Sequence, residues 1–390
     1  SWPIGPDEAT LRQRWAALLR SSSRASAMRE TRDRKVKKGY PSPGSFLGGG
    51  APIADLSENE PMPQLAPYAY RSFDRQLIIA DNRLIDFPRP SLWRSMSDKQ
   101  LFLTSLIEAP LGAGPAVTAT AAVPDLHHLR GSFGGKDVMP LYRDTEGTEP
   151  NIRPGLLDQL ATIYGKPVSP EDFAAYIACV LAHPGYTAEL EPELETPGPR
   201  VPMTREAELF DEAANLGRQV LWLHTYGDRF ADPSAGRPPH IPAGRAKNTR
   251  PVSQEPEKYP EEYVYDEGCQ ELRVGDGMFA PVSPEVWQYE VSGLPVVSSW
   301  LGYRMRSRAG RISSHLDEIQ PERWTAELTD QLLELLWVVE GLVALEPAQR
   351  ALFERIVKAP LLEERDLPAL GNEHPARKEP SFAPQGQLMV

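Results

Sequence analysis

The sequence has little cysteine and no long apolar run. Its two cysteines, Cys179 and Cys269, form neither a metal-binding spacing nor a disulfide framework, so we expect a reducing compartment. The longest apolar run, around 332–345, is short and contains Glu334 and Glu340, so we expect no membrane-spanning segment. No signal peptide opens the chain. These absences predict a cytoplasmic protein.

Motifs of the common enzyme classes are also missing. The sequence contains no Gly-x-Ser-x-Gly, no His-Glu-x-x-His and no Asp/Asn-Pro-Pro-aromatic tetrapeptide of the kind that adenine methyltransferases use to hold a flipped base. The glycine-rich stretches 46–50, 131–136 and 275–280 lack the neighbouring elements or residues that cofactor or phosphate binding requires, so we interpret them as turns. His127 and His128 have no third ligand at metal-binding spacing and are predicted to be structural. The residues alone favour a binding domain over an enzyme.

The charge is unevenly distributed. A formal net charge of −12 argues against a general nucleic-acid coat protein, but it does not exclude a local basic cleft. The tract 24–38 is strongly basic, and we interpret it as a solvated helix face, with contact to phosphates or to an acidic neighbour as the alternative.

The stretch 276–311 is the feature around which we expect the chain to be organised. Its apolar part ends at Trp300 and Leu301, and a basic run without any acid follows from 303 to 311. The planar guanidinium of arginine suits phosphates and guanine edges. At spacing two, Arg304, Arg306 and Arg308 would share one face of an extended strand. A solvated basic turn is the alternative reading.

Periodicity and turn signals predict an α+β fold: a mixed β-sheet with a helical layer, a β-hairpin and C-terminal helices. Ser169 and Thr204 are expected to cap helices, and Glu346-Pro347 is expected to split the C-terminal pair. The predicted parts are a basic helical connector (1–40), a Pro/Gly-rich linker (41–67), the mixed-sheet part of a recognition domain (68–145), the helical layer (146–230), a loop or arm (231–262), the hairpin and basic recognition segment (263–312), C-terminal helices (313–365) and a disordered tail (366–390).

Several segments, taken in order, resemble the C-terminal specificity region of the single-chain type ISP restriction-modification enzymes and of related phage-defence DNA methyltransferases. The resemblance extends from about Tyr68 to Leu345. It is carried by the segments 70–75, 81–86, 139–142, 171–176, 181–186, 199–202 and 282–289, followed by Gly293 and Trp300. The ordered set is more specific than any single segment.

The resemblance implies a function and partners. In this family a methyltransferase core precedes the specificity region, which reads the DNA target beside it. The implied partners are therefore double-stranded DNA and a methyltransferase domain or subunit, on the same longer chain or separate. No cofactor is expected in this chain, because S-adenosylmethionine would lie in the methyltransferase. This chain is thus expected to be a part or a partner of an adenine-specific DNA methyltransferase, not an enzyme on its own. A structural or protein-interaction module of a defence complex is the alternative, followed by an enzyme with an unrecognised site.

The basic residues of two segments are the predicted DNA contacts, and no catalytic or metal-binding residue is predicted. We expect the segments 68–94 and 303–311 to form an arginine-lined concavity, because phosphate affinity depends on local charge. The predicted contacts are Arg71, Arg75, Arg83, Arg89, Arg94, Lys136, Tyr303, Arg304, Arg306, Arg308 and Arg311.

Overall fold

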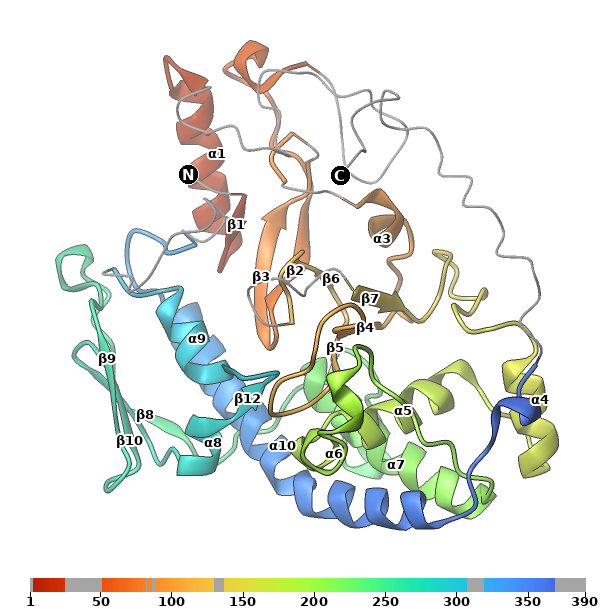
Figure 1. Ribbon diagram of the computed structural model, residues 1–390. Coiled ribbons are helices and arrows are strands. Elements are labelled where there is room, and N and C mark those ends of the chain that lie inside the picture. Colours follow the sequence, from red (N-terminus) through yellow and green to blue (C-terminus); the bar gives the residue numbers. More distant parts are fainter. Residues whose placement is uncertain are drawn as a thin grey trace.

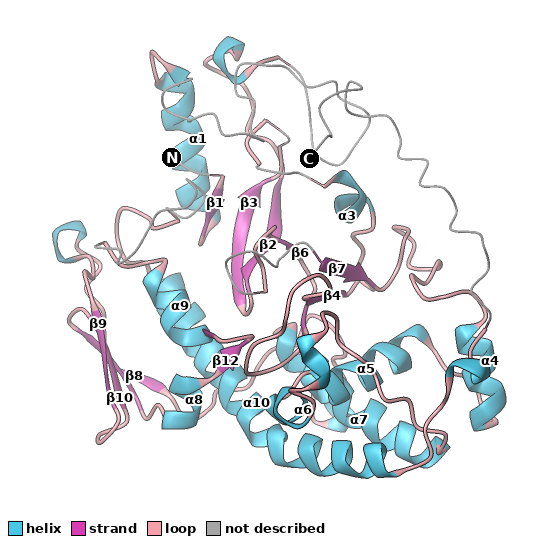
Figure 2. Ribbon diagram, viewed as in Figure 1, coloured by secondary structure: helices cyan, strands magenta, loops and turns pink. Residues whose placement is uncertain are grey.

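The computed structural model describes residues 3–24, 51–81, 83–85, 89–129, 137–306 and 319–368. The predicted α+β class is confirmed: several small sheets and a group of packed helices make up this part of the chain (Figure 1). Most helices lie together in the lower part of the molecule, and the strands lie above and to the left of them (Figure 2). The rest of the basic tract after Arg24, and the tail after 368, lie outside the described residues.

Two sheets occupy the region predicted to be a single mixed sheet. The first has the order β1-β3-β2-β6, in which β2 and β3 form an antiparallel hairpin and β6 runs parallel to β2. The second has the order β5-β4-β7 and is antiparallel. Their strands are β1 (Ile4–Gly5), β2 (Leu65–Arg71), β3 (Asp74–Ile79), β4 (Phe102–Ser105), β5 (Thr118–Thr120), β6 (Val123–Pro124) and β7 (Asp137–Pro140).

The predicted helical layer consists of α4 (Leu156–Tyr164), α5 (Pro170–Leu181), α6 (Pro184–Glu189) and α7 (Ala207–His224). Ser169 caps α5 in a reciprocal capping box with Asp172, as predicted. The prediction that Thr204 caps α7 is wrong, because the cap position is Glu206, whose N–H donates to the Thr204 hydroxyl at 3.1 Å.

A third sheet, with the order β8-β11-β10-β9, projects at one side of the molecule (Figure 1). It contains the predicted hairpin as β9 (Tyr263–Asp266) and β10 (Glu271–Val274), and adds β8 (Lys247–Arg250) and β11 (Gly277–Ala280). Ser283 caps α8 (Pro284–Gln288), as its Ser-Pro-Glu sequence predicts. The short ladder of β12 (Glu290–Val291) and β13 (Leu294–Pro295) then leads into α9 (Val296–Gly302).

The C-terminal helices are continuous, so the predicted break at Glu346-Pro347 is wrong. A single helix, α10, runs from Ala326 to Lys358 with Pro347 inside it and bends along the lower edge of the molecule (Figure 1). Proline removes one helical hydrogen bond. Buried residues on both sides, such as Leu342 and Phe353, keep the helix packed through that position. The N-terminal helix α1 (Glu8–Arg20) is capped by Asp7, and α3 (Pro90–Arg94) follows the first sheet.

Candidate nucleic-acid interface

Arg71 is the centre of a buried network at the end of β2. Its guanidinium donates to the Asp125 carboxylate at 2.7 Å and to the Tyr303 hydroxyl at 3.0 Å. Arg71 is only 5 % exposed, and its Cζ atom lies 4.0 Å from the centroid of the Tyr70 ring. Tyr68 also donates to Asp125, at 2.8 Å. Arg71 therefore connects β2 to the residue after β6 and to the end of α9.

The surroundings of Asp125 keep its carboxylate charged. Burial alone would raise the pKa of Asp125, but the Arg71 charge, the His127 backbone N–H and the Tyr68 hydroxyl together lower it below its usual value. For Tyr68, burial followed by the nearby Asp125 charge raises the pKa, so the hydroxyl remains a donor. The network is thus a paired arginine and carboxylate at neutral pH.

A second buried pair joins Arg304 and Asp74, each 1 % exposed. Two guanidinium nitrogens donate to the two carboxylate oxygens at 2.9 and 2.7 Å, the bidentate arrangement that makes arginine–carboxylate pairs strong. The Arg304 Cζ atom lies 3.6 Å from the Trp300 ring centroid. Gln76 donates to Asp74 at 2.9 Å. This pair fastens the tip of the β2–β3 hairpin to the end of α9.

The remaining arginines predicted in the 68–94 segment lie in different surroundings. Arg83 is buried against the carboxylate of Asp81. Arg89 is half-buried and donates to a backbone carbonyl, and desolvation of its guanidinium lowers its pKa. Arg75 is partly exposed and forms an ion pair with Glu334 of α10. Arg94 is half-buried at the end of α3.

The predicted arginine-lined concavity is wrong. Arg71, Arg83 and Arg304 lie in the interior, where their guanidinium groups are paired with carboxylates rather than directed to the surface. The physical reason is that a buried cation is stable only when it is paired and hydrogen-bonded. Lys136, Arg308 and Arg311 lie outside the described residues.

The predicted extended strand through the basic run is also wrong. After α9, the backbone N–H groups of Arg304 and Met305 both donate to the Leu301 carbonyl, at 2.8 and 3.1 Å, so the chain makes a turn. Arg304 and Met305 are consequently buried, Tyr303 is half-buried and Arg306 is exposed. The alternation of faces that a strand would impose is therefore absent from residues 303–306.

Arg306 lies on the surface beside the third sheet. Its backbone N–H donates to the Pro260 carbonyl at 3.0 Å, and its guanidinium donates to the Pro256 carbonyl. The Cζ atom lies 5.6 Å from the Tyr259 ring centroid. Arg306 is exposed, and within the described part of the chain no carboxylate pairs with it.

The two sides of the segment 307–318 are held together. The Gln320 side chain donates to the Met305 carbonyl at 3.1 Å. Arg14 of α1 donates to the Gln320 carbonyl at 2.8 Å and to the Ile4 carbonyl at 2.6 Å. Met305 and Gln320 are thereby fixed to one another and to the N-terminal helix.

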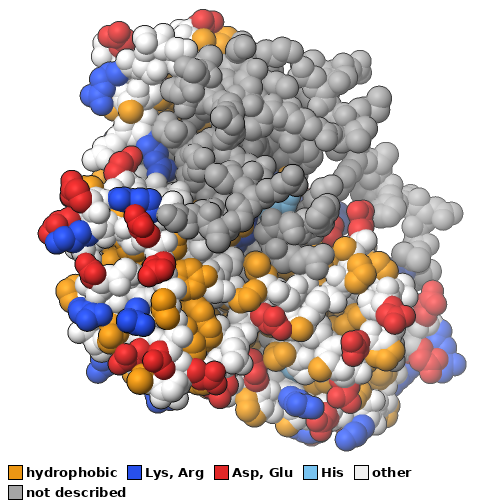
Figure 3. Space-filling view, turned by 60° about the vertical axis from the view of Figure 1, so that its left-hand side comes forward, with side chains coloured by type: hydrophobic (Ala, Val, Ile, Leu, Met, Phe, Trp, Pro, Cys, Tyr) orange, Lys and Arg blue, Asp and Glu red, His pale blue; other side chains and the backbone are white. Residues whose placement is uncertain are grey.

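The outer face of the third sheet carries cations that we did not predict from the sequence. Arg250, Met278, Arg273 and Val264 are directly opposite one another on β8, β11, β10 and β9, so they form one row across the sheet. Arg273 is exposed between the buried Leu272 and Val274, an alternation visible in the sequence. We use the name Arg306 surface for three exposed arginines, Arg306 beside the 256–260 loop and Arg250 and Arg273 on the outer face of the sheet. Acidic and basic side chains are intermixed on this side of the molecule (Figure 3).

The described residues hold no cluster of three or more His, Cys, Asp or Glu side chains that could bind a metal ion. His128 bonds to Thr104 at 3.1 Å, and His224 accepts from the Ala119 N–H at 3.1 Å, so both are structural, as predicted for His128. None of the helices within the described ranges is long and apolar enough to cross a membrane.

Comparison with known proteins gives the family. Residues 1–335 match the Type ISP C-terminal specificity domain. This chain belongs to that family. The family resemblance predicted from the sequence is confirmed. No curated protein matches this specificity domain significantly.

Two solved structures share the fold of the specificity domain. The DrdV–DNA complex matches with 19 % sequence identity and a TM-score of 0.56, over 92 % of this chain and 34 % of that one. The ATP-dependent Type ISP restriction-modification enzyme LlaBIII bound to DNA matches with 12 % identity and a TM-score of 0.58, over 93 % of this chain and 22 % of that one. The specificity domain thus spans about a third and about a fifth of these longer chains.

Proposed function

We propose that this specificity domain recognises a DNA target for an adenine-specific DNA methyltransferase of a restriction-modification system. The observation that carries the proposal is the match of residues 1–335 to the Type ISP C-terminal specificity domain. The shared fold with two proteins whose structures contain DNA supports it. The methyltransferase would be a domain of a longer chain or a separate subunit, and the cytoplasm would be the site of action.

We infer that the buried and the exposed arginines have different roles. Arg71 and Arg304 hold the β2–β3 hairpin, the residue after β6 and the end of α9 in fixed positions. The Arg306 surface supplies solvent-facing guanidinium groups that suit phosphate oxygens and guanine edges. In this proposal the buried pairs position the surface, and the exposed arginines contact the duplex. Arg94, Lys136, Arg308 and Arg311 remain predicted contacts.

Replacing Arg306 with alanine is expected to weaken binding to specific and scrambled duplexes alike. A phosphate contact releases condensed counterions, so its loss should lower the slope of log affinity against log salt by about 0.9. If Arg306 contacts a base instead, the specific duplex alone should lose about 1–3 kcal/mol of binding free energy. Fluorescence anisotropy over a series of salt concentrations, with the methyltransferase part added, measures both quantities.

The matched control is Arg350→Ala. Arg350 is an exposed arginine on α10 with 63 % of its side chain accessible, and its loss removes the same charge far along the chain from the Arg306 surface. If Arg306→Ala and Arg350→Ala leave affinity and salt slope equally unchanged, Arg306 is a solvated turn residue. The protein-interaction module then becomes the better reading of the chain.

We also propose that S-adenosylmethionine binds to the associated methyltransferase and not to this chain. The sequence lacks the Asn-Pro-Pro-Tyr type of tetrapeptide, and the Phe46–Gly50 match to a cofactor loop lies within a Pro/Gly-rich stretch outside the described residues. Calorimetric titration of the chain with S-adenosylmethionine should give no binding heat beyond dilution. Micromolar affinity for the cofactor would contradict this assignment.

A further inference from the structure

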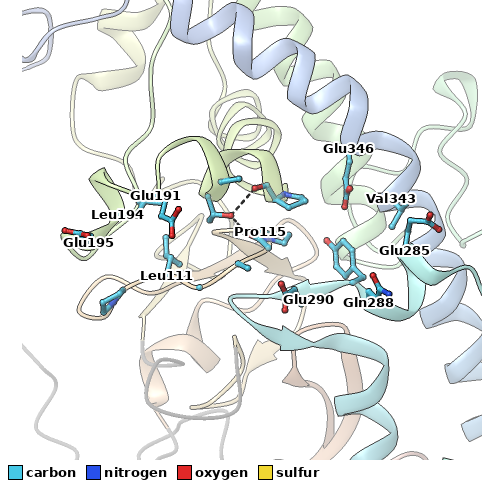
Figure 4. A pocket seen from close by; sticks show the side chains of 18 residues that line it. Leu111, Pro115, Glu191, Leu194, Glu195, Glu285, Gln288, Glu290, Val343 and Glu346 are labelled. Atoms are coloured by element: carbon cyan, nitrogen blue, oxygen red, sulfur yellow. Dashed lines mark hydrogen bonds between the residues drawn. The ribbon is translucent and has the colours of Figure 1, made fainter. Parts of the chain in front are cut away.

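A cavity of about 680 Å³ lies between the helical layer and the C-terminal helix, and none of the predicted DNA contacts lines it. Four segments form its walls: 110–115, 184–195, 285–290 and the α10 residues Val343 and Glu346. This volume is within the range of small-molecule sites in proteins, about 300–1,000 Å³. The segments come from distant parts of the sequence and converge around one space (Figure 4).

Backbone contacts hold the 110–115 loop in place. The Gly112 N–H donates to the Ser292 hydroxyl at 3.0 Å, and the Gly293 N–H donates to the Ala113 carbonyl at 2.8 Å. Thr187 of α6 donates to the Gly114 carbonyl at 2.8 Å. A Cβ atom on Gly114 would lie 2.1 Å from a backbone oxygen of β12, so only glycine permits this close approach. Hydrogen bonds and close backbone packing therefore fix the position of this wall of the cavity.

The charges lining the cavity have one sign. Its ionisable carboxylates are Glu191, Glu195, Glu285, Glu290 and Glu346, and its lining includes no lysine or arginine. Within the described part of the chain, none of these glutamates forms an ion pair. Burial raises the pKa of Glu346 to about 7. The carboxylates thus lack an internal counter-charge.

Tyr289 gives a second observation at the cavity. Its side chain is only 6 % exposed and lines the cavity, but its hydroxyl oxygen is not one of the fully buried polar atoms of the described residues that lack a partner, so the oxygen is reached from the cavity. Burial and then the neighbouring Glu346 charge raise the pKa of Tyr289, so the hydroxyl stays protonated. The Tyr289 hydroxyl is therefore available to a molecule in the cavity.

The arrangement of these groups indicates the chemistry of the ligand. Glu191 and Glu195 lie on one side, and Glu285 and Glu346 lie on the other (Figure 4). No three acidic side chains converge as a metal site would require in the described residues. Apolar side chains, Leu111, Pro115, Leu194 and Val343, separate the carboxylates. An extended aliphatic chain with an ammonium group at each end fits this arrangement. The ammonium groups would lie at the two acidic sides of the cavity, and the methylene groups would lie against its apolar walls.

We propose that this cavity binds a protonated aliphatic polyamine. The ammonium groups pair with glutamates on opposite sides, the methylene groups pack on the apolar walls, and the Tyr289 hydroxyl contributes a hydrogen bond. A single lysine side chain from a partner protein would supply only one ammonium group and leave the other side unpaired. The proposal is independent of the DNA-contact residues, since the cavity and the Arg306 surface share none.

Calorimetric titration of the full chain with spermidine at low salt tests the proposal. The expected result is saturation at one equivalent, with about tenfold lower affinity in Glu191→Gln and in Glu346→Gln, because each substitution removes a charged partner on one of the two sides. Glu208→Gln is the control: it removes an exposed acid from the first turn of α7 and should bind like the unchanged protein. Equal affinity in all three variants would overturn the site.

Two further measurements separate a specific site from general attraction to a chain of net charge −12. Mg²⁺ at the same concentration of positive charge should not displace spermidine from a specific site. It would displace spermidine if the binding were diffuse counterion attraction, which depends on charge alone. Diacetylated spermidine, which lacks terminal charges, should bind the unchanged protein at least tenfold more weakly. Displacement by Mg²⁺, or equal binding of the diacetylated compound, would each overturn the proposal even if a glutamine variant failed to fold.

Discussion

Replacing Asp74 with alanine is expected to lower the free energy of unfolding by about 3–5 kcal/mol, because it leaves the buried Arg304 cation without its carboxylate. Both side chains are 1 % exposed, and the pair is bidentate. The substitution also removes the acceptor for Gln76. Unfolding in urea followed by circular dichroism measures the change.

Glu334→Ala is the matched control for Asp74→Ala. It removes the carboxylate partner of Arg75, the next residue of the same hairpin, but that pair is about one-third exposed. An exposed ion pair contributes about 0–1 kcal/mol, so the control should change stability little.

The double variant Asp74→Leu/Arg304→Met removes both charges and should be less destabilised than Asp74→Ala alone. Equal effects of Asp74→Ala and Glu334→Ala would contradict the assigned role of the pair.

Gly217→Ala is expected to destabilise the helical layer by about 3 kcal/mol or more, at the upper end of the usual range for overpacked cores. A Cβ atom at Gly217 of α7 would lie 1.8 Å from the Ala175 carbonyl oxygen of α5. The obstacle is helix backbone, so the two helices would have to separate. The unfolding midpoint in urea should fall, and proteolysis of the native chain should become faster.

Gly302→Ala provides the comparison for this second variant. Gly302 is the last residue of α9, and no atom lies within 4 Å of a Cβ placed there. Alanine favours the helical conformation by about 1 kcal/mol over glycine, so stability should stay the same or rise slightly. A loss at Gly302 as large as the loss at Gly217 would show that the close helix crossing does not explain the effect at Gly217.

Local signals in the sequence predicted local structure well. Ser169 was predicted to cap a helix, and its side chain accepts a hydrogen bond from the first turn, as the side chains of Asp7 and Ser283 do at two other helices. A capping side chain and the N–H group that donates to it are only two or three residues apart, so the interaction can be predicted from a short stretch of sequence. The prediction for Thr204 was wrong because Thr204 lies two residues before the cap position, Glu206, and its hydroxyl accepts from the Glu206 N–H instead of from the first turn.

The burial of the arginines could not be predicted from the sequence. Asp125 is 54 residues from Arg71, and Asp74 is 230 residues from Arg304. A basic run identifies charge, but only the fold decides which carboxylates lie within reach. The same limit applies to the third sheet: the β9–β10 hairpin was predicted, whereas β11 pairs with β10, and the polar strand β8 pairs with β11 through a register shift between Met278 and Phe279.

The hydrogen bond between Gln320 and Met305 joins two residues that are 15 apart in the sequence. Because this contact and the two hydrogen bonds from Arg14 hold both residues in place, we expect a change in the length of the chain between them to cost little stability. Doubling the length of a closed segment costs only about 0.6 kcal/mol of chain entropy.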